Sequence, residues 1–195
     1  MNEPHILRSL GKGKRGIVQL IRWKSGLAVL KTPAPKSTAV KRLANEAAWL
    51  QRLNAYGIGP QLYFFSERDG KEQLIMEYIN GVPFEEYLRS CTPFQRRFVT
   101  LSVFKQCRIM DGLNVTKYEM HKPVKHIIVR KNKPVLIDFE RCTITLRPKN
   151  VTQFAEYMVR LGFSHDKSKL LPSLQHYKKE YSPRAYRDVI SSFSF

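Results

Sequence analysis

Short apolar runs separated by turn residues dominate the first third of the chain. Residues 16–23 are rich in β-branched side chains of partly alternating polarity, and residues 27–31 are apolar up to a final charge. The three residues between these runs, Lys-Ser-Gly, have the composition of a tight turn. The pattern therefore predicts an antiparallel hairpin, because two such runs joined by a short turn pair with each other.

Helical periodicity follows a proline-broken loop. Apolar residues recur every three to four positions over residues 40–53, which predicts an amphipathic helix that ends before Gly57. Residues 62–66 and 73–78 are then predicted as two further strands around a turn at residues 68–71. These elements make the first part of the chain rich in strands, with one helix.

The Asn80-Gly81 break separates this strand-rich part from a largely helical part. We therefore expect an α+β fold of two lobes, with a first domain at residues 1–79 and a second at residues 80–195. In the second domain, helices are predicted at residues 83–88, 93–113, 151–161 and 170–193, and strands at residues 126–129 and 134–138.

The composition adds a large positive charge. Among 195 residues, 34 are Lys or Arg and 16 are Asp or Glu, which gives a formal net charge of +18. The apolar content of 43% is that of ordinary globular proteins, so an intrinsically disordered chain is excluded. A surplus of this size favours a polyanionic partner such as nucleic acid, nucleotide or a membrane surface.

Cysteine usage and the terminal pattern indicate the compartment. The three cysteines are widely spaced and form no C-x-x-C pair, which argues against a zinc site or a disulfide framework and favours a reducing compartment. The N-terminus lacks the layout of a signal peptide, and no apolar run approaches the length of a membrane span. We therefore expect a soluble cytoplasmic protein with no membrane partner.

A glycine-rich loop is the first candidate for chemistry. Gly11, Gly13 and Gly16, followed by Val18, fit the pattern G-x-G-x-x-G-x-V. Such a loop lets backbone N–H groups close over phosphates, which a Cβ would obstruct, although glycine loops also occur in unrelated turns. A dinucleotide-binding loop requires a strand before the glycines and a helix after them. Here a strand follows, so that interpretation is excluded.

Three charged residues follow the glycine loop. Lys31 ends an apolar run, Glu46 lies within the predicted helix, and Asp138 ends an apolar strand. Each has an ordinary interpretation: a lysine at a strand end, a solvated helix charge, and a helix cap or ion-pair partner. Their order along the chain instead favours a phosphate-binding lysine oriented by a carboxylate, and a metal-binding aspartate.

Together these features resemble the sequence of a minimal eukaryotic-type protein kinase. The plan is similar to that of the RIO kinases and of the small kinase of the KEOPS tRNA-modification complex, and most similar to archaeal predicted Ser/Thr kinases with a Pro-x-Lys-His segment. The resemblance extends from Leu10 to Cys142. It implies a bilobal protein-kinase-like fold, ATP and Mg²⁺ as cofactors, and transfer of the ATP γ-phosphate to a hydroxyl of a protein substrate.

The resemblance also implies roles for individual residues. Lys31 would hold the α and β phosphates and pair with Glu46, and Asp138, in Asp-Phe-Glu where kinases have Asp-Phe-Gly, would bind Mg²⁺. Residues 74–81 resemble the hinge that faces the adenine, although an edge strand before a turn has the same pattern. The implied ATP-binding residues are Gly11, Gly13, Gly16, Val18, Val29, Lys31, Glu46, Met76, Glu77 and Ile79.

The catalytic loop departs from the kinase pattern H-R-D-x-x-x-x-N, in which the Asp accepts the hydroxyl proton and the Asn binds a second metal ion. If His126 replaces the Asn, an ungapped match places His121 at the base position, and a two-residue insertion places Glu119 there. Both side chains accept protons, whereas His126 is a softer metal ligand than Mg²⁺ prefers. Lys125 would neutralise charge on the transferred phosphoryl group.

The segment after Asp138 leaves no room for a long activation segment, and no A-P-E motif follows. Docking of an ordinary peptide and regulation by activation-loop phosphorylation are therefore not expected. The alternative is a catalytically impaired pseudokinase that binds nucleotide and RNA, such as tRNA, which the net charge of +18 favours. Basic residues gather in residues 122–149 and 167–187, and the tyrosines at 177, 181 and 186 either stack on bases or form the packed side of a helix.

Overall fold

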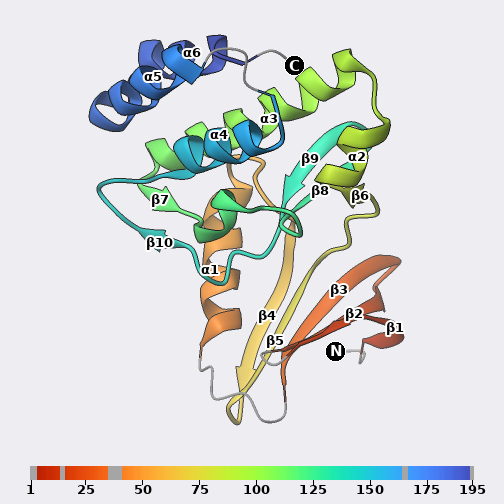
Figure 1. Ribbon diagram of the computed structural model, residues 1–195. Helices are drawn as coiled ribbons and strands as arrows, with labels where there is room; N and C mark the ends of the chain where they lie inside the picture. Colours follow the sequence, from red (N-terminus) through yellow and green to blue (C-terminus); the bar gives the residue numbers. More distant parts are fainter. Residues whose placement is uncertain (1–3, 14–15, 35–40, 164–166, 194–195) are drawn as a thin grey trace. The chain divides into compact units, whose positions relative to one another are not determined.

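The computed structural model is a mixed α+β structure (Figure 1). Its described residues contain a five-stranded antiparallel sheet and six α-helices, so the α+β class expected from the sequence is confirmed. No helix in the described part of the chain combines the length and apolar character that crossing a bilayer requires. The structure describes residues 4–13, 16–34, 41–163 and 167–193.

The chain divides into two compact units. The first unit consists of Met1–Asn80 together with Ile137–Arg141, and the second of Gly81–Leu136 together with Cys142–Phe195. The first unit therefore contains the Asp-Phe-Glu segment, which the sequence-based division assigns to the second domain. The candidate metal ligand Asp138 thus belongs to the same unit as the glycine loop and Lys31.

An antiparallel sheet forms the framework of the first unit. Its strands are β1 (His5–Lys12), β2 (Gly16–Trp23), β3 (Gly26–Pro33), β4 (Leu62–Arg68) and β5 (Lys71–Glu77). They lie in the order β1-β2-β3-β5-β4, so β5 pairs with both β3 and β4. The predicted hairpin is confirmed as β2 and β3, in register from Gly16 opposite Pro33 to Trp23 opposite Gly26.

Helix α1 (Arg42–Asn54) packs on β3, β4 and β5 and confirms the helix predicted for residues 40–53 (Figure 1). Its first turn is capped by a distant side chain, since the backbone N–H groups of Leu43 and Ala44 donate to the carboxylate of Glu72 in β5, at 3.4 and 3.1 Å. A carboxylate at this end satisfies free N–H groups and complements the helix dipole. This contact fixes the N-terminus of α1 against the sheet.

The two faces of β3 have different environments, because successive residues of a strand point to opposite faces. Ala28 and Leu30 belong to a buried cluster with Ile21 and Ile75. Lys31 therefore points to the other face of the sheet, where α1 packs. The alternation places one charged side chain of an otherwise apolar strand toward the helix.

Helices make up most of the second unit, around a core that includes the rings of Phe84, Phe104 and Phe154. The helices are α2 (Phe84–Ser90), α3 (Pro93–Gly112), α4 (Asn150–Arg160), α5 (Lys167–Glu180) and α6 (Pro183–Ser191). The short strands are β6 (Val82–Pro83), β7 (Val115–Thr116), β8 (Ile127–Arg130), β9 (Lys133–Leu136) and β10 (Thr143–Ile144). They form two small sheets, in the orders β6-β8-β9 and β10-β7.

The helical region predicted at residues 170–193 consists of two helices, α5 and α6. Tyr181 has a left-handed backbone with φ of 49°, which ends the regular helix. The side chain of Ser182 then accepts a hydrogen bond from the backbone N–H of Ala185 at 3.2 Å, and Pro183 occupies the first turn. A serine cap followed by proline is a strong helix start, so the chain begins α6 here.

Candidate functional site

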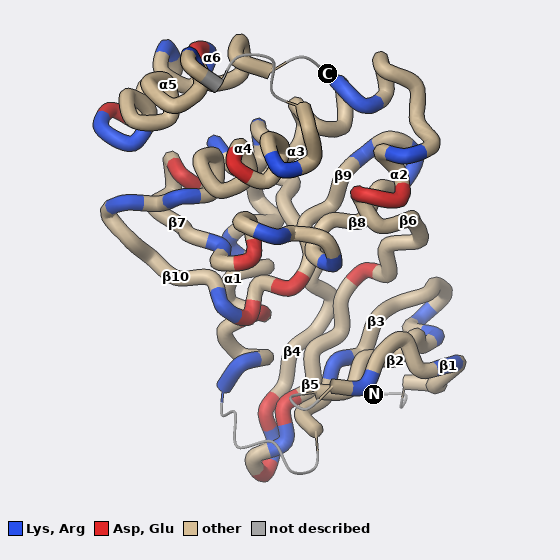
Figure 2. Tube along the Cα trace, viewed as in Figure 1, with Lys and Arg blue, Asp and Glu red and all other residues tan. Residues whose placement is uncertain are grey.

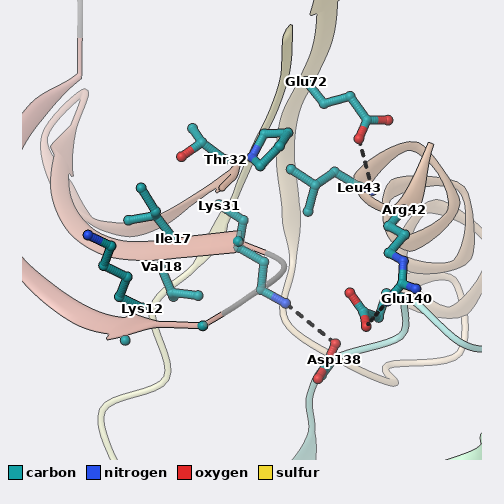
Figure 3. A pocket seen from close by; sticks show the side chains of 14 residues that line it. Lys12, Ile17, Val18, Lys31, Thr32, Arg42, Leu43, Glu72, Asp138 and Glu140 are labelled. Atoms are coloured by element: carbon teal, nitrogen blue, oxygen red, sulfur yellow. Dashed lines mark hydrogen bonds and ion pairs between the residues drawn. The ribbon is translucent and has the colours of Figure 1, made fainter. Parts of the chain in front are cut away.

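A pocket of about 590 Å³ lies beside the glycine loop of the first unit (Figure 3). Its walls come from the loop, β2, β3, the first turn of α1 and the Asp-Phe-Glu segment. Six of the residues that the sequence assigns to nucleotide or metal binding meet at this cavity. They are Gly11, Gly13, Gly16, Val18, Lys31 and Asp138.

Lys31 lies between two carboxylates. Its Nζ is 2.7 and 2.8 Å from the two carboxylate oxygens of Glu46 and 3.7 Å from Oδ1 of Asp138. Only 15% of the Lys31 side chain is exposed. Burial by itself lowers the pKa of Lys31, but the adjacent carboxylates outweigh this effect and raise the pKa above its ordinary value. Lys31 is therefore a cation at neutral pH.

Glu46 is a buried ion-pair partner, with 1% of its side chain exposed, and not a solvated helix charge. Burial raises the pKa of Glu46, and the Lys31 ammonium opposes that effect. Oε1 of Glu46 also accepts a hydrogen bond from the backbone N–H of Phe139 at 3.3 Å. One carboxylate thus joins α1, β3 and the Asp-Phe-Glu segment.

The segment that carries Asp138 is attached to α1 through Glu140, two residues after Asp138. Nδ2 of Asn45 donates to the backbone carbonyl of Glu140 at 2.8 Å, and Nη1 of Arg42 lies 3.2 Å from Oε1 of the same residue. Asp138 itself has φ of 65°, a left-handed conformation that persists only where the surroundings fix it. These contacts fix the backbone that directs the Asp138 carboxylate toward Lys31 (Figure 3).

The glycine loop closes through a backbone hydrogen bond from the N–H of Gly13 to the carbonyl of Gly16 at 3.0 Å. A Cβ on Gly16 would lie 3.1 Å from the carbonyl oxygen of Thr32, so packing within the chain favours glycine there. A Cβ on Gly11 or Gly13 would meet nothing within 4 Å. The space beside these two glycines leaves room for phosphates to approach the backbone. Residues 14 and 15 lie outside the described residues.

Asp138 offers an oxygen ligand at this pocket, with 35% of its side chain exposed. Across the described ranges, no group of three or more His, Cys, Asp or Glu side chains forms a metal cluster. Mg²⁺ is commonly bound by one or two carboxylates, with phosphate oxygens and water completing its shell. The carboxylate of Asp138, beside a candidate phosphate site, therefore fits this ion.

The residues expected to face adenine lie at and after the end of β5. Val29 and Met76 pair across β3 and β5, and both are buried, as is Ile79. The backbone N–H of Glu77 donates to the carbonyl of Gln61 at 2.8 Å, and its carboxylate accepts from the backbone N–H of Gln61 at 3.2 Å. None of these expected residues is among the described residues that line the pocket beside the glycine loop. Their role toward adenine stays a prediction.

The candidate base Glu119 lies in the second unit, in a 3₁₀ helix at Tyr118–His121. Its carboxylate is 3.1 Å from Nζ of Lys117, whose side chain is completely buried. A buried lysine is rare unless it is paired, so this ion pair holds the Glu119 side chain in one position. Lys117 was not predicted from the sequence, in which its place two residues before Glu119 is its signal.

The other residues expected in the catalytic loop also lie in the second unit. Nδ1 of His121 is 2.7 Å from the carbonyl oxygen of Tyr118, and because a carbonyl only accepts, Nδ1 carries the hydrogen. Nε2 is then the proton acceptor of the neutral ring. Lys125 is exposed, whereas His126 is half-buried and its backbone N–H donates to the carbonyl of Pro123 at 2.9 Å. The roles of Lys125 and His126 stay predictions.

A buried polar network supports the segment that carries Lys117. The carboxylate of Asp111 accepts hydrogen bonds from the backbone N–H groups of Asn150 and Val151, at 3.0 and 3.2 Å, and from the hydroxyl of Tyr177 at 2.9 Å. Burial raises the pKa of Asp111, and these donors oppose that effect. Oδ1 of Asn150 in turn accepts from the backbone N–H of Lys117 at 2.8 Å. The network was not predictable because its members are far apart in the sequence.

Comparison with known proteins does not assign the chain to a family. No protein-family model matches the chain, and no curated protein matches it. The functional conclusion therefore rests on the pocket of the first unit, on the Glu119 segment of the second unit, and on the order of these residues in the sequence.

Proposed function

We propose that this chain is an ATP-dependent phosphotransferase of the Ser/Thr protein-kinase type, with a minimal bilobal kinase fold. It transfers the γ-phosphate of ATP to a hydroxyl acceptor. The observation that carries the proposal is the Lys31 ammonium, which two carboxylates hold at a pocket lined by the glycine loop. A cation fixed at a pocket with open space beside Gly11 and Gly13 suits a polyphosphate better than it suits a neutral ligand.

Lys31 binds the α and β phosphates of ATP in this proposal. Glu46 sets the position of the ammonium, because contacts to both carboxylate oxygens, at 2.7 and 2.8 Å, restrict the lysine side chain. The glycine loop approaches the phosphates through its backbone. Prior positioning of these groups lowers the entropy lost when ATP is bound and aligned.

Asp138 supplies an oxygen ligand for Mg²⁺ in this proposal. Magnesium bound with ATP neutralises charge on the phosphates. The protein fixes the position of this carboxylate. Arg42 and Asn45 of α1 bind Glu140, which anchors the backbone two residues after Asp138. Substituting Glu140 is therefore expected to weaken Mg²⁺-dependent binding of ATP without removing a ligand.

The resemblance to kinases gives two candidates for the acceptor of the hydroxyl proton, Glu119 and His121. As the acceptor oxygen bonds to the γ-phosphorus, the bond from that phosphorus to the bridging oxygen breaks and ADP leaves. The hydroxyl proton passes either to the carboxylate of Glu119 or to Nε2 of His121. The 3.1 Å contact with Lys117 holds the first candidate in place. The variants Glu119→Gln and His121→Gln separate the two, because only the variant that lacks the base loses transfer while it still binds ATP.

Transfer of labelled γ-phosphate to the protein itself or to Ser/Thr peptides, together with hydrolysis of ATP, tests the proposal in the presence of Mg²⁺. Lys31→Ala and Asp138→Asn are expected to lower both rates by at least about a hundredfold. The matched variants Lys133→Ala and Asp188→Asn lie in the second unit and are not among the residues that line the pocket. They are expected to keep both rates within about twofold of the wild type. Equal rates in the wild type and in both pocket variants would contradict the proposal.

A further inference from the structure

A second, strongly basic pocket of about 970 Å³ lies wholly within the second unit. One wall is the segment between β10 and α4, and the other is the C-terminal half of α5 with the residue that follows it. The pocket shares no residue with the pocket beside the glycine loop. Its described lining residues are Leu146, Arg147, Lys149, Gln175, Lys178, Lys179 and Tyr181.

Four of these residues are exposed cations, and none of the described lining residues is acidic. Arg147 and Lys149 come from one wall, and Lys178 and Lys179 from the other. Figure 2 shows the Lys and Arg positions of the chain in blue, with stretches of blue before α4 and in α5. The acidic neighbour Glu180 is engaged elsewhere, since its carboxylate accepts from Nε2 of His176 and from the hydroxyl of Ser182. Like charges gathered in one cavity repel each other, and a bound polyanion relieves that repulsion.

One residue joins the two walls. The hydroxyl of Tyr181 donates to the backbone carbonyl of Pro148 at 2.8 Å, so the end of α5 is tied to the segment before α4. The guanidinium of Arg108 in α3 donates to the backbone carbonyl of Tyr181 and lies 5.6 Å from the ring centroid of Tyr177. The spacing between the cations of the two walls is therefore set by the packed backbone.

We propose that this pocket binds the phosphodiester backbone of a single-stranded nucleic acid. Four cations on two fixed walls suit successive phosphates, and the volume is much larger than a single phosphate needs. Leu146 at the pocket is 88% exposed and gives a base an apolar surface to pack on. This site explains part of the +18 net charge, which an ATP pocket with one placed lysine does not.

The same geometry limits the role of the tyrosines. Tyr177 is completely buried, its hydroxyl is bound to Asp111, and its ring packs edge-on against Tyr181 at 5.3 Å between centroids. Of the two interpretations of these residues, packing therefore applies to Tyr177, which is not accessible to a base. The contribution of Tyr181 is to position Pro148 and the cations beside it.

Fluorescence anisotropy with a labelled single-stranded RNA of about 15 nucleotides tests the site without ATP. The pocket variant Arg147→Gln/Lys149→Gln/Lys178→Gln/Lys179→Gln is compared with Arg97→Gln/Lys105→Gln/Lys131→Gln/Lys133→Gln, which removes the same charges from exposed positions of the same unit. At about 100 mM salt, the pocket variant is expected to bind at least about tenfold more weakly than this control. Its slope of log K against log salt is expected to fall by about 3, which corresponds to four phosphate contacts on a single strand.

Three results would overturn the proposal: equal losses in the two variants, no binding by the wild type at about 100 mM salt, or binding only of an acidic peptide such as polyglutamate. Circular dichroism checks that both variants fold, and the double variant Lys178→Gln/Lys179→Gln, at two exposed positions of α5, provides a milder test with about half the change in slope. Lys31→Ala is expected to bind RNA like the wild type. The rates of phosphate transfer and ATP hydrolysis therefore test the kinase proposal, and the RNA affinities test this one separately.

Discussion

Lys31 is the residue whose surroundings most determine its chemistry. A lysine at the end of a strand commonly extends into water, but this one contacts two carboxylates and is largely enclosed. Removing one partner of a buried pair leaves the other charge without compensation, which costs far more than an exposed ion pair contributes. The pair of Lys31 and Glu46 therefore constrains stability as well as ligand binding.

A double-mutant cycle measures this coupling. Lys31→Met is expected to lower the free energy of unfolding by about 3 kcal/mol, because it leaves the buried Glu46 carboxylate unpaired. Adding Glu46→Gln to Lys31→Met removes that charge and is expected to recover a large part of the loss. Urea unfolding of the wild type, the two single variants and the double variant gives the four free energies. Strictly additive losses would show that the ion pair does not couple these residues.

Gly59 packs closely against the ring of Phe139, the middle residue of the Asp-Phe-Glu segment. Its φ is 83°, and a Cβ there would lie 2.8 Å from the Phe139 ring and 2.9 Å from Cδ2 of Leu50. Gly57 has a similar φ of 67° but open space around it. The two positions therefore separate backbone strain from steric overlap.

Gly57→Ala is expected to lower the free energy of unfolding by about 1 kcal/mol, the cost of a left-handed alanine. Gly59→Ala is expected to lower it by about 3 kcal/mol, because overlap with Phe139 and Leu50 adds to the same backbone cost. Denaturant unfolding of both variants provides the comparison. Equal losses would mean that the ring of Phe139 moves aside at little cost.

At the scale of elements, the start of α4 depends on a residue from another helix. The side chain of Lys149, the N-cap residue of α4, makes no capping hydrogen bond. Asp111, at the end of α3, instead accepts from the backbone N–H groups of Asn150 and Val151, the first two residues of α4. The same carboxylate accepts from Tyr177 of α5, so one residue connects three helices. Donors that are buried at a helix end without an acceptor destabilise the folded state. Replacing Asp111 is therefore expected to lower the stability of the protein strongly.

Asp111→Ala is expected to lower the free energy of unfolding by at least about 3 kcal/mol, since it leaves several buried donors unsatisfied. Tyr177→Phe removes one donor together with its hydrogen bond and is expected to cost about 1 kcal/mol. Asp188→Ala, at a half-buried carboxylate 4.0 Å from His176, serves as the control and is expected to change stability by less than about 0.5 kcal/mol. Similar losses in all three variants would contradict the role given to Asp111.

Helices and strands with a clear periodicity of apolar residues were predictable from the sequence, and those without it were not. The hairpin of β2 and β3, the strands β4 and β5, and α1 follow from apolar spacing and turn residues. All eight residues of β1 are exposed, so no buried face marks this strand in the sequence. The two-residue strands β7 and β10 form only because distant segments pair. Ser182-Pro183 is a local signal for the break between α5 and α6. The prediction of one helical region at residues 170–193 did not use it.

In the candidate site as well, residues with a local sequence pattern were predictable and contacts between distant residues were not. Gly11, Lys31 and Asp138 were found from their order in the sequence, and the structure brings them to one pocket. The supporting contacts were missed because they depend on tertiary packing: Glu72 caps a helix 29 residues before it, and Arg42 contacts Glu140 across 98 positions. No local pattern encodes such pairs, whereas a strand that ends in a charged residue is visible in any short window.

At the scale of the whole molecule, the net charge of +18 acts on stability as well as on binding. Repulsion among surplus cations destabilises a compact chain, and salt screens that repulsion. Raising NaCl from about 20 to 300 mM is therefore expected to increase the melting temperature by a few degrees. A thermal unfolding series followed by circular dichroism measures this change. A melting temperature that falls with salt would show that attractive ion pairs outweigh the repulsion.

The most direct test of the proposed function is the binding of ATP itself, measured by isothermal titration calorimetry with Mg²⁺ present. The wild type is expected to bind one ATP per chain. Lys31→Ala is expected to weaken binding by about 10- to 100-fold, the cost of losing a charged hydrogen-bonding partner of the phosphates. The control Lys133→Ala, on an exposed strand residue of the second unit, is expected to bind like the wild type. Equal affinities in all three proteins, or no binding by the wild type, would contradict the account of the Lys31 pocket as an ATP site.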